Sequence, residues 1–268
     1  MLPLAFSPSF TALLKETQLT RDILGAGATQ LRRANYAEKG TYFLAFTGLA
    51  TGLDRLGKLC LMLDHLLQHG HWPELAQLKQ DVGYRLLLIH ERIDALALRR
   101  GLRLQFRQRL DDPMHLTVLR CLHDFAESDR YADLQVQAAP VTADPLADWI
   151  RLVDVPLFQK RVSARKQVSI RHSTDLVARL MGAEATVLQD AETADAGPQL
   201  MDADYGTAAN AVAPHRQLSV LQIVRHWVEV LGELQRQALQ VRRDMPDLAE
   251  AFNAFLCADH HLKARKTW

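Results

Sequence analysis

The sequence predicts an all-α protein built as a multi-helix bundle. Apolar residues recur at steps of three and four through most of the 268 residues, which is the period of a helix with one buried face. No series of alternating strands accompanies them. A content of 48% hydrophobic and 24% charged residues is typical of a globular protein rather than a disordered one.

The first half of the chain contains five helical patterns. Ser7 and Pro8 predict the start of the first, because Ser caps helices and Pro fits their first turn. A long pattern follows over 36–68, in which Gly48 and Gly52 would let another helix approach closely. Pro73 opens a short helix that ends near 80. The remaining two patterns cover 81–99 and, after an Asp-Pro pair, 115–125.

The second half is interrupted by a segment over 130–214 that we expect to be irregular. Inside it, Asp144 and Pro145 open a short helix, and alternating apolar residues over 162–170 favour a short strand or extended arm. Residues 182–214 contain no Lys or Arg and six acidic residues, as in a long acidic loop.

Two helices complete the chain, which we divide into three parts. The clearest helical pattern of the sequence covers 218–241, and an Asp-x-x-Glu box at Asp247 and Glu250 begins the last helix. We expect a helical bundle over 1–129, the irregular segment over 130–214, and helices over 215–268 that pack on the same bundle. Together these parts form one domain.

Charge and cysteine content exclude several classes of protein. A net charge of +1 excludes a globally basic nucleic-acid coat, although a local basic patch remains compatible with it. Cys60, Cys121 and Cys257 form no CxxC pair, so we expect free thiols in a reducing cytoplasm. Asp54 and Lys58 interrupt the longest apolar run, which therefore reads as a core helix and not as a membrane span. We expect a cytoplasmic protein without a membrane partner.

No motif in the sequence indicates a cofactor. The chain lacks a P-loop, a GxSxG elbow, an HExxH pair and a dinucleotide fingerprint. Its histidines form two groups without the paired spacing of a structural zinc site, so we expect neither metal nor cofactor. A metal or small-ligand bundle that uses His65 and His69 remains an alternative. The two groups are His65, His69 and His71, and Cys257, His260 and His261.

One segment is strongly basic. Five positive charges occur there with no acidic residue between them: Lys160, Arg161, Arg165, Lys166 and Arg171. An extended chain would place Arg161, Arg165 and Arg171 on one side, as a strip that follows the phosphates of a nucleic acid. The alternative is a solvated edge that pairs with the acidic loop downstream.

Arg85 and His90 form the most suggestive pair. In one helix they would lie about 140° apart, on either side of its buried stripe. That helix is apolar over much of its circumference, so it is buried or meets a second subunit. Across a two-fold axis, His90 could accept the proton of an RNA 2′-hydroxyl while Arg85 stabilises charge on the phosphate. Alternatively, Arg85 extends to solvent and His90 borders the core.

Residues 45–59 resemble the second helix of HEPN domains (higher eukaryotes and prokaryotes nucleotide-binding), in which an acidic residue and then Lys precede a leucine-rich stretch. Asp54 and Lys58 match these positions. The resemblance extends over about 36–125, through the loop at 71–75 to the helix that holds Arg85 and His90. Many HEPN proteins are dimeric, metal-independent RNases of toxin–antitoxin and phage-defence systems that use an Arg-x(4–6)-His motif. The resemblance therefore implies RNA as substrate, a homodimer and a catalytic motif. Two segments match that motif: Arg85 with His90, and Arg165 with His172.

Two functions follow from these observations. The first is a HEPN-like, metal-independent ribonuclease of a bacterial defence or toxin–antitoxin module, with one of the two Arg–His pairs in catalysis and Lys160, Arg161, Lys166 and Arg171 in RNA binding. The alternative is a non-catalytic, oligomeric helical interaction or scaffold protein that contacts a protein partner.

Overall fold

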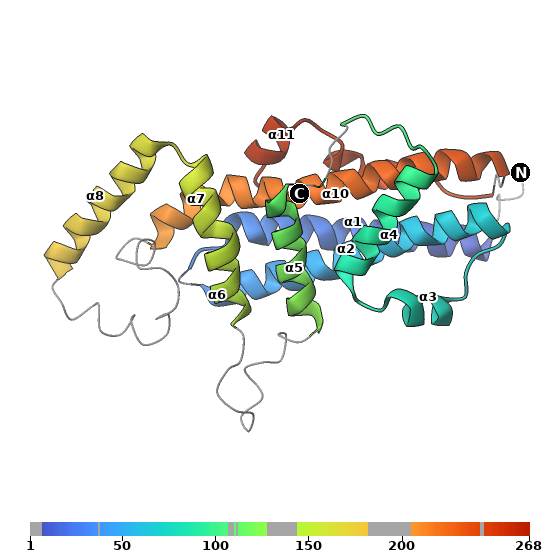
Figure 1. Cartoon of the computed structure of the whole chain (residues 1–268), viewed down its shortest axis with the longest axis horizontal. Coiled ribbons are helices and arrows are strands. Elements are labelled where there is room, and N and C mark those ends of the chain that lie inside the picture. Colours follow the sequence, from blue (N-terminus) through green and yellow to red (C-terminus); the bar gives the residue numbers. More distant parts are fainter. Residues whose placement is uncertain are drawn as a thin grey trace, which may run out of the picture.

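A computed structural model describes residues 7–36, 38–106, 110, 112–127, 144–181, 205–241 and 244–268. Within these ranges the chain is helical and contains no strand, so the predicted all-α class is confirmed (Figure 1). The elements are α1 (Pro8–Arg33), α2 (Lys39–His69), α3 (Leu75–Val82), α4 (Leu86–Arg99), α5 (Pro113–Glu127), α6 (Pro145–Trp149), a π-helical turn (Ile150–Asp154), α7 (Val155–Arg161), α8 (Ala164–Met181), α10 (Tyr205–Val241), a 3₁₀ helix (Glu250–Phe255) and α11 (Asp259–Ala264).

Three long helices form the body of the bundle. In Figure 1, α2 and α10 run in the same direction and α1 runs in the opposite one, while α4, α5 and the α6–α7 segment cross them. Helix α2 contacts α1, α10, α4 and α5 and is therefore central. Its buried face includes Leu49, Leu53 and Leu56, none of which has exposed surface.

Glycines bring α1 and α2 into backbone contact. A Cβ atom placed on Gly48 would lie 3.0 Å from the Cα of Gly27, and one on Gly27 would lie 2.8 Å from the backbone nitrogen of Leu49. A Cβ on Gly52 would meet the side chain of Leu24 at 2.6 Å. The close approach predicted for Gly48 and Gly52 is confirmed, and Gly27 is its counterpart on α1.

The expectation of an irregular segment with a strand over 162–170 is wrong for the described residues. Residues 145–161 and 164–181 are helical, and only Val162 and Ser163 separate α7 from α8. Of the alternating apolar residues, Val162 and Ile170 are buried, whereas Ala164 and Val168 are exposed. The apolar alternation therefore has two separate causes: Val162 is buried at the corner between α7 and α8, and Ile170 is buried on one face of α8. It does not indicate a strand.

The start of the clearest helix also differs from the prediction. Helix α10 begins at Tyr205 and not at 218, so the last ten residues of the expected acidic loop are helical. Small residues such as Ala208, Ala209 and Val212 are buried there, which explains why a composition typical of loops forms a packed helix. The rest of that loop, with all its acidic residues, lies outside the described residues, as do 128–143.

A buried ion pair joins α10 to the π-helical turn. Arg216 and Asp154 have no exposed side-chain surface, and the Nη1 atom of Arg216 lies 2.9 Å from the Oδ2 atom of Asp154. Trp149 and Tyr42 also donate hydrogen bonds to this carboxylate, at 3.1 and 3.0 Å. Arg216 further donates to the carbonyls of Leu31 and Ala34 at the end of α1. One guanidinium thus connects three segments of the bundle.

Candidate nucleic-acid interface

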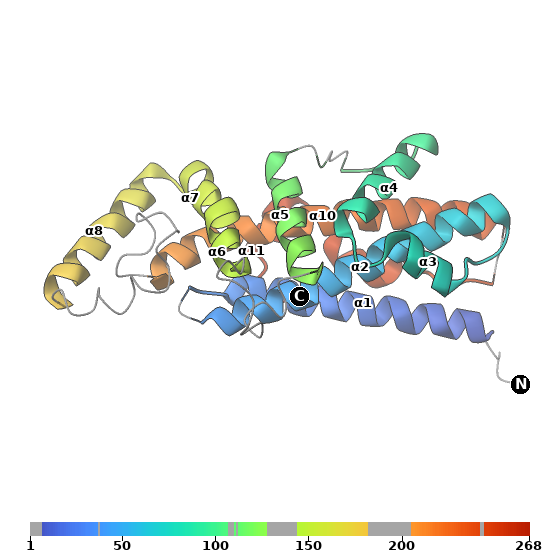
Figure 2. The same cartoon turned by 60° about the horizontal axis from the view of Figure 1, so that its bottom comes forward.

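The five predicted basic residues lie around the corner between α7 and α8. Lys160 and Arg161 end α7, where positive charge is favoured next to the unpaired carbonyls of a helix C-terminus. Ser163 then precedes α8, and its Oγ accepts a hydrogen bond from the backbone nitrogen of Lys166 at 3.4 Å. Both figures of the whole chain show α8 extending away from the long helices at one end of the bundle (Figures 1 and 2).

One side chain holds this corner. The Nε2 atom of Gln167, on the first turn of α8, lies 3.0 Å from the carbonyl oxygen of Phe158, 3.2 Å from that of Gln159 and 2.8 Å from that of Val162. These carbonyls belong to the last turn of α7 and to the corner residue, and that of Phe158 also accepts a hydrogen bond from the backbone nitrogen of Val162. Gln167 therefore fixes the direction in which α8 leaves α7.

Positive charge at the corner and along the first half of α8 is exposed to solvent. Five residues, which we call the basic surface, are all exposed: Lys160, Arg161, Arg165, Lys166 and Arg171. Within the described part of the chain, their only ion pair joins Arg161 to Asp112, at 4.0 Å. The basic surface is therefore available to an anionic partner.

Helix formation also aligns the second Arg–His pair. Arg165 and His172 lie seven residues apart on α8, which places them on one face with about 10 Å between them along the axis. Both side chains are exposed. The extended arrangement expected for Arg161, Arg165 and Arg171 is replaced by a helical one, in which His172 joins the basic residues.

The first Arg–His pair is not brought together within one chain. The helix predicted over 81–99 is divided in two. Gly83, in a left-handed conformation (φ +53°), follows the end of α3, and α4 begins at Leu86. Arg85 therefore precedes α4 and does not lie inside it. The Arg85 side chain donates to the carbonyls of Asp81 and Val82, at 2.8 and 3.3 Å. It therefore folds back on the end of α3 and not toward His90.

His90 is part of the core. Its side chain is 6% exposed, and its ring stacks on that of Trp227, with 6.3 Å between centroids. Burial lowers the pKa of His90, although the neighbouring carboxylate of Asp94 acts in the opposite direction. Asp94 lies 3.5 Å from His90 Nε2 and 3.2 Å from His226 Nε2, so it links α4 to α10. This position matches the alternative in which His90 borders the core.

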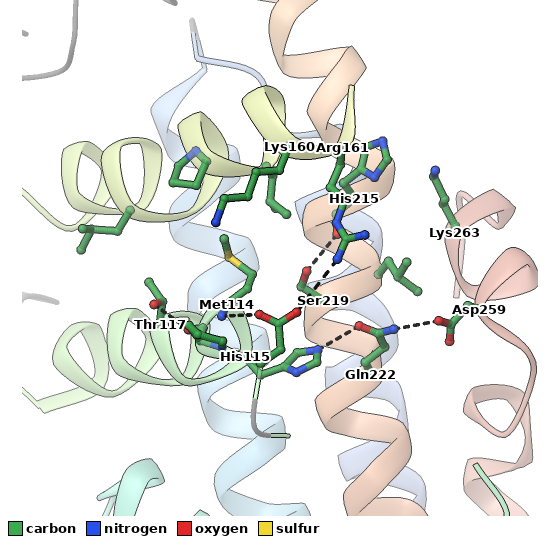
Figure 3. A pocket seen from close by; sticks show the side chains of 16 residues that line it. Met114, His115, Thr117, Lys160, Arg161, His215, Ser219, Gln222, Asp259 and Lys263 are labelled. Carbon is green, nitrogen blue, oxygen red and sulfur yellow. Dashed lines mark hydrogen bonds and ion pairs between the residues drawn. The ribbon is translucent and has the colours of Figure 1, made fainter. Parts of the chain in front are cut away.

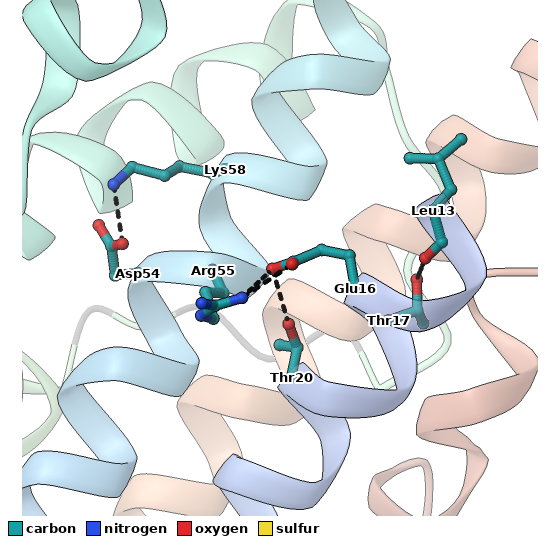
Figure 4. Close-up of polar contacts among 7 residues, drawn as sticks. All are labelled: Leu13, Glu16, Thr17, Thr20, Asp54, Arg55 and Lys58. Atoms are coloured by element: carbon teal, nitrogen blue, oxygen red, sulfur yellow. Dashed lines mark hydrogen bonds and ion pairs between the residues drawn. The ribbon is translucent and has the colours of Figure 1, made fainter. Parts of the chain in front are cut away.

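The acidic residue and Lys on which the resemblance rests form an ion pair on α2. Lys58 Nζ lies 2.7 Å from Asp54 Oδ2, and Arg55 reaches Glu16 of α1 at 2.6 Å (Figure 4). Burial raises the pKa of Asp54, and the hydrogen bond from Lys58 opposes that shift. Lys58 also lies over the ring of Tyr84, 4.8 Å from its centroid. The pair therefore lies within α2, and Lys58 links it to Tyr84.

The histidine groups do not assemble a metal site in the described residues. The rings of His65 and His69 lie 4.3 Å apart between centroids, and those of His260 and His261 lie 3.9 Å apart. Across the same ranges, no group of three or more His, Cys, Asp or Glu side chains is arranged to hold a metal ion.

Burial raises the pKa of the Cys121 thiol to about 12, which leaves it unreactive at neutral pH.

A cavity of about 880 Å³ lies beside the basic surface, between α5, α7, α10 and α11. Lys160 and Arg161 line it together with three side chains that the sequence analysis did not select, His215, Ser219 and Lys263 (Figure 3). Their separation along the chain explains the omission, because no local spacing connects them. Lys263, a basic residue of the last helix, is the one member of this set whose charge hints at an anion site in the sequence.

No helix among the described residues is long and apolar enough to cross a membrane. Comparison with known proteins adds no relative: no protein-family model, no curated protein and no solved structure matches the chain.

Proposed function

We propose that this protein binds RNA on the basic surface and cleaves it without a metal ion, as a HEPN-like ribonuclease would. The observation that supports the proposal most directly is the helical form of α8. It places Arg165 and His172 on one exposed face, among basic residues that have almost no ion pairs within the described part of the chain. Exposed cations without counter-charges are the groups that attract nucleic-acid phosphates.

The cleavage step uses the nucleophile that RNA carries. His172 accepts the proton of a 2′-hydroxyl, and the 2′-oxygen attacks the adjacent phosphorus. The bond from phosphorus to the 5′-oxygen then breaks, which leaves a 2′,3′-cyclic phosphate and, after protonation, a 5′-hydroxyl. Arg165 stabilises the negative charge that develops on the phosphate oxygens. Because the nucleophile, base and stabilising cation are organic groups, EDTA should not inhibit the reaction.

Binding is tested by removing three charges from α8. The Arg165→Gln/Lys166→Gln/Arg171→Gln variant should bind single-stranded RNA more weakly. The slope of log K against log salt concentration should become about 2 smaller in magnitude, since each phosphate contact on a single strand contributes about 0.7. Fluorescence anisotropy at salt concentrations from about 50 to about 200 mM measures both the affinity for RNA and its slope against salt.

A matched control removes three exposed charges outside the basic surface, two from α1 and one from α10, in the Lys15→Gln/Arg21→Gln/Arg236→Gln variant. This control has the same net charge as the α8 variant. Equal salt slopes for the two variants would show that RNA responds only to net charge, which contradicts binding at the basic surface.

Cleavage is tested with two histidine variants in EDTA. His172→Ala should reduce the cleavage rate at least about 100-fold, the usual contribution of a positioned general base. His90→Ala should keep its activity under conditions in which it remains folded by circular dichroism. Product ends should be 2′,3′-cyclic phosphates. Loss of cleavage in His90→Ala alone would assign catalysis to the first pair and contradict the role of His172.

The second candidate function is a non-catalytic, oligomeric interaction protein. Its support is a pair of exposed apolar side chains at the two ends of α4: Tyr84, just before the helix, is 65% exposed, and Leu98, in its last turn, is 82% exposed. A partner that covered either end would bury this apolar surface. This function would replace the first if the protein neither binds nor cleaves RNA.

A further inference from the structure

The cavity beside the basic surface has an excess of positive charge. Lys160 and Arg161 reach it from α7, and Lys263 reaches it from α11 (Figure 3). Lys160 and Lys263 form no ion pair with any described residue. The three cations come from two elements that are about 100 residues apart in sequence, so the fold itself brings them to one cavity.

The two acidic residues of the cavity are already engaged. Asp259 lies 2.7 Å from Arg225 Nη2 and accepts a hydrogen bond from Gln222 Nε2 at 2.9 Å. Asp112 accepts a hydrogen bond from the backbone nitrogen of Met114 at 2.9 Å, at the start of α5, and lies 4.0 Å from Arg161. Because both carboxylates already have partners, Lys160 and Lys263 can interact with an anionic ligand in the cavity.

We propose that this cavity binds a phosphate monoester, and that its ligand is the terminal phosphate of an RNA strand bound on the basic surface. The assignment to an RNA end rests on the proposed function, whereas the phosphate chemistry rests on the cavity alone. Lys160 and Arg161 belong both to the basic surface and to the cavity wall, so a strand that follows α7 and α8 reaches the cavity with its end.

The size and walls of the cavity suit a nucleotide better than a bare anion. A volume of about 880 Å³ lies in the range of small-molecule sites and exceeds what one phosphate group fills. Leu157 and Leu218 supply apolar surface for a sugar or base, and Ser219 supplies a hydroxyl. A terminal nucleotide with its phosphate uses all three kinds of surface.

His215, at the edge of the same cavity, reports its positive potential. Its pKa is lowered to about 4, by burial first and then by the charges of Lys263, Arg161 and Arg32. The other charged or titratable groups of the lining are Lys160, Asp112, His115 and Asp259. A bound phosphate would oppose the effect of these cations, so the pKa of His215 should rise when the cavity is occupied.

The experiment compares Lys263→Gln with Lys266→Gln, a matched control three residues away that does not line the cavity. The probes are adenosine 5′-monophosphate and one oligoribonucleotide in three forms: 5′-phosphorylated, 3′-phosphorylated and without terminal phosphate. We expect a phosphorylated form to bind the wild type at least about tenfold more tightly than the unphosphorylated one, as for one charge-assisted contact. That preference should disappear in Lys263→Gln and persist in Lys266→Gln.

A second readout is local. In NMR titrations of the wild type, the monophosphate should raise the pKa of the His215 imidazole, and in Lys263→Gln it should not at the same concentration. RNA binding that is indifferent to terminal phosphates, with no response of His215, overturns the cavity site while the proposed RNA function stands. A response of His215 to the monophosphate without any RNA binding supports the phosphate site, assigns it to a free nucleotide and refutes the proposed RNA function.

Discussion

Arg216→Met should destabilise the protein by about 3–5 kcal/mol, as does the loss of one partner from other buried ion pairs. The variant leaves the Asp154 carboxylate, which has no exposed surface, without its cationic partner, although Tyr42 and Trp149 still donate to it. It also removes the hydrogen bonds from α10 to the carbonyls of Leu31 and Ala34 at the end of α1. Urea unfolding followed by circular dichroism measures the change.

Two further variants separate the possible causes of this loss. Arg236→Met removes an exposed arginine from the same helix, and its urea unfolding curve should match that of the wild type. The double variant Asp154→Leu/Arg216→Met should be more stable than Arg216→Met, since it no longer buries an unpaired charge. A loss below about 1 kcal/mol in Arg216→Met would contradict the central role of this pair.

Gly27→Ala should cost about 1–3 kcal/mol, the usual range for overpacking a core. The added methyl group would meet the backbone nitrogen of Leu49 at 2.8 Å, and a backbone atom cannot rotate away as a side chain does. Helices α1 and α2 would have to separate along their contact. Thermal or urea unfolding measures the loss.

Gly40→Ala is the control for that prediction. Gly40 lies on α2, and a Cβ atom there would meet nothing within 4 Å. Alanine is the better helix former, so this variant should keep or slightly increase the stability of the protein. Equal losses in both variants would point to a general effect of replacing glycine and not to the α1–α2 contact.

The helical architecture could be predicted because most helices bury one continuous face. The pattern over 36–68 became α2 (Lys39–His69), and its buried residues recur at the expected steps. The prediction failed where one apolar residue was buried for a different reason. Val162 packs at a corner and Ile170 on a helix, and together they imitate the alternation of a strand.

The candidate site was predictable in its charges but not in its shape. Lys160, Arg161 and Arg171 are indicated by their closeness in sequence, and all three are exposed in the structure. His215 and Lys263 depend on the packing of α10 and α11 against α7, which no local pattern records. Arg216 did carry a signal, since it occupies the same helical stripe as Val212 and Val220. A charged residue on such a stripe predicts a buried partner.

The three hydrogen bonds of Gln167 have a consequence for the entropy of binding. They hold the end of α7 and the start of α8 at one angle before any ligand arrives. Ordering one residue of a free chain costs about 1–2 kcal/mol of conformational entropy at room temperature, and a hinged corner would lose such freedom on binding. Because the angle is already fixed, a ligand that bound across both helices would meet a preorganised surface, and more of its contact energy would remain as affinity.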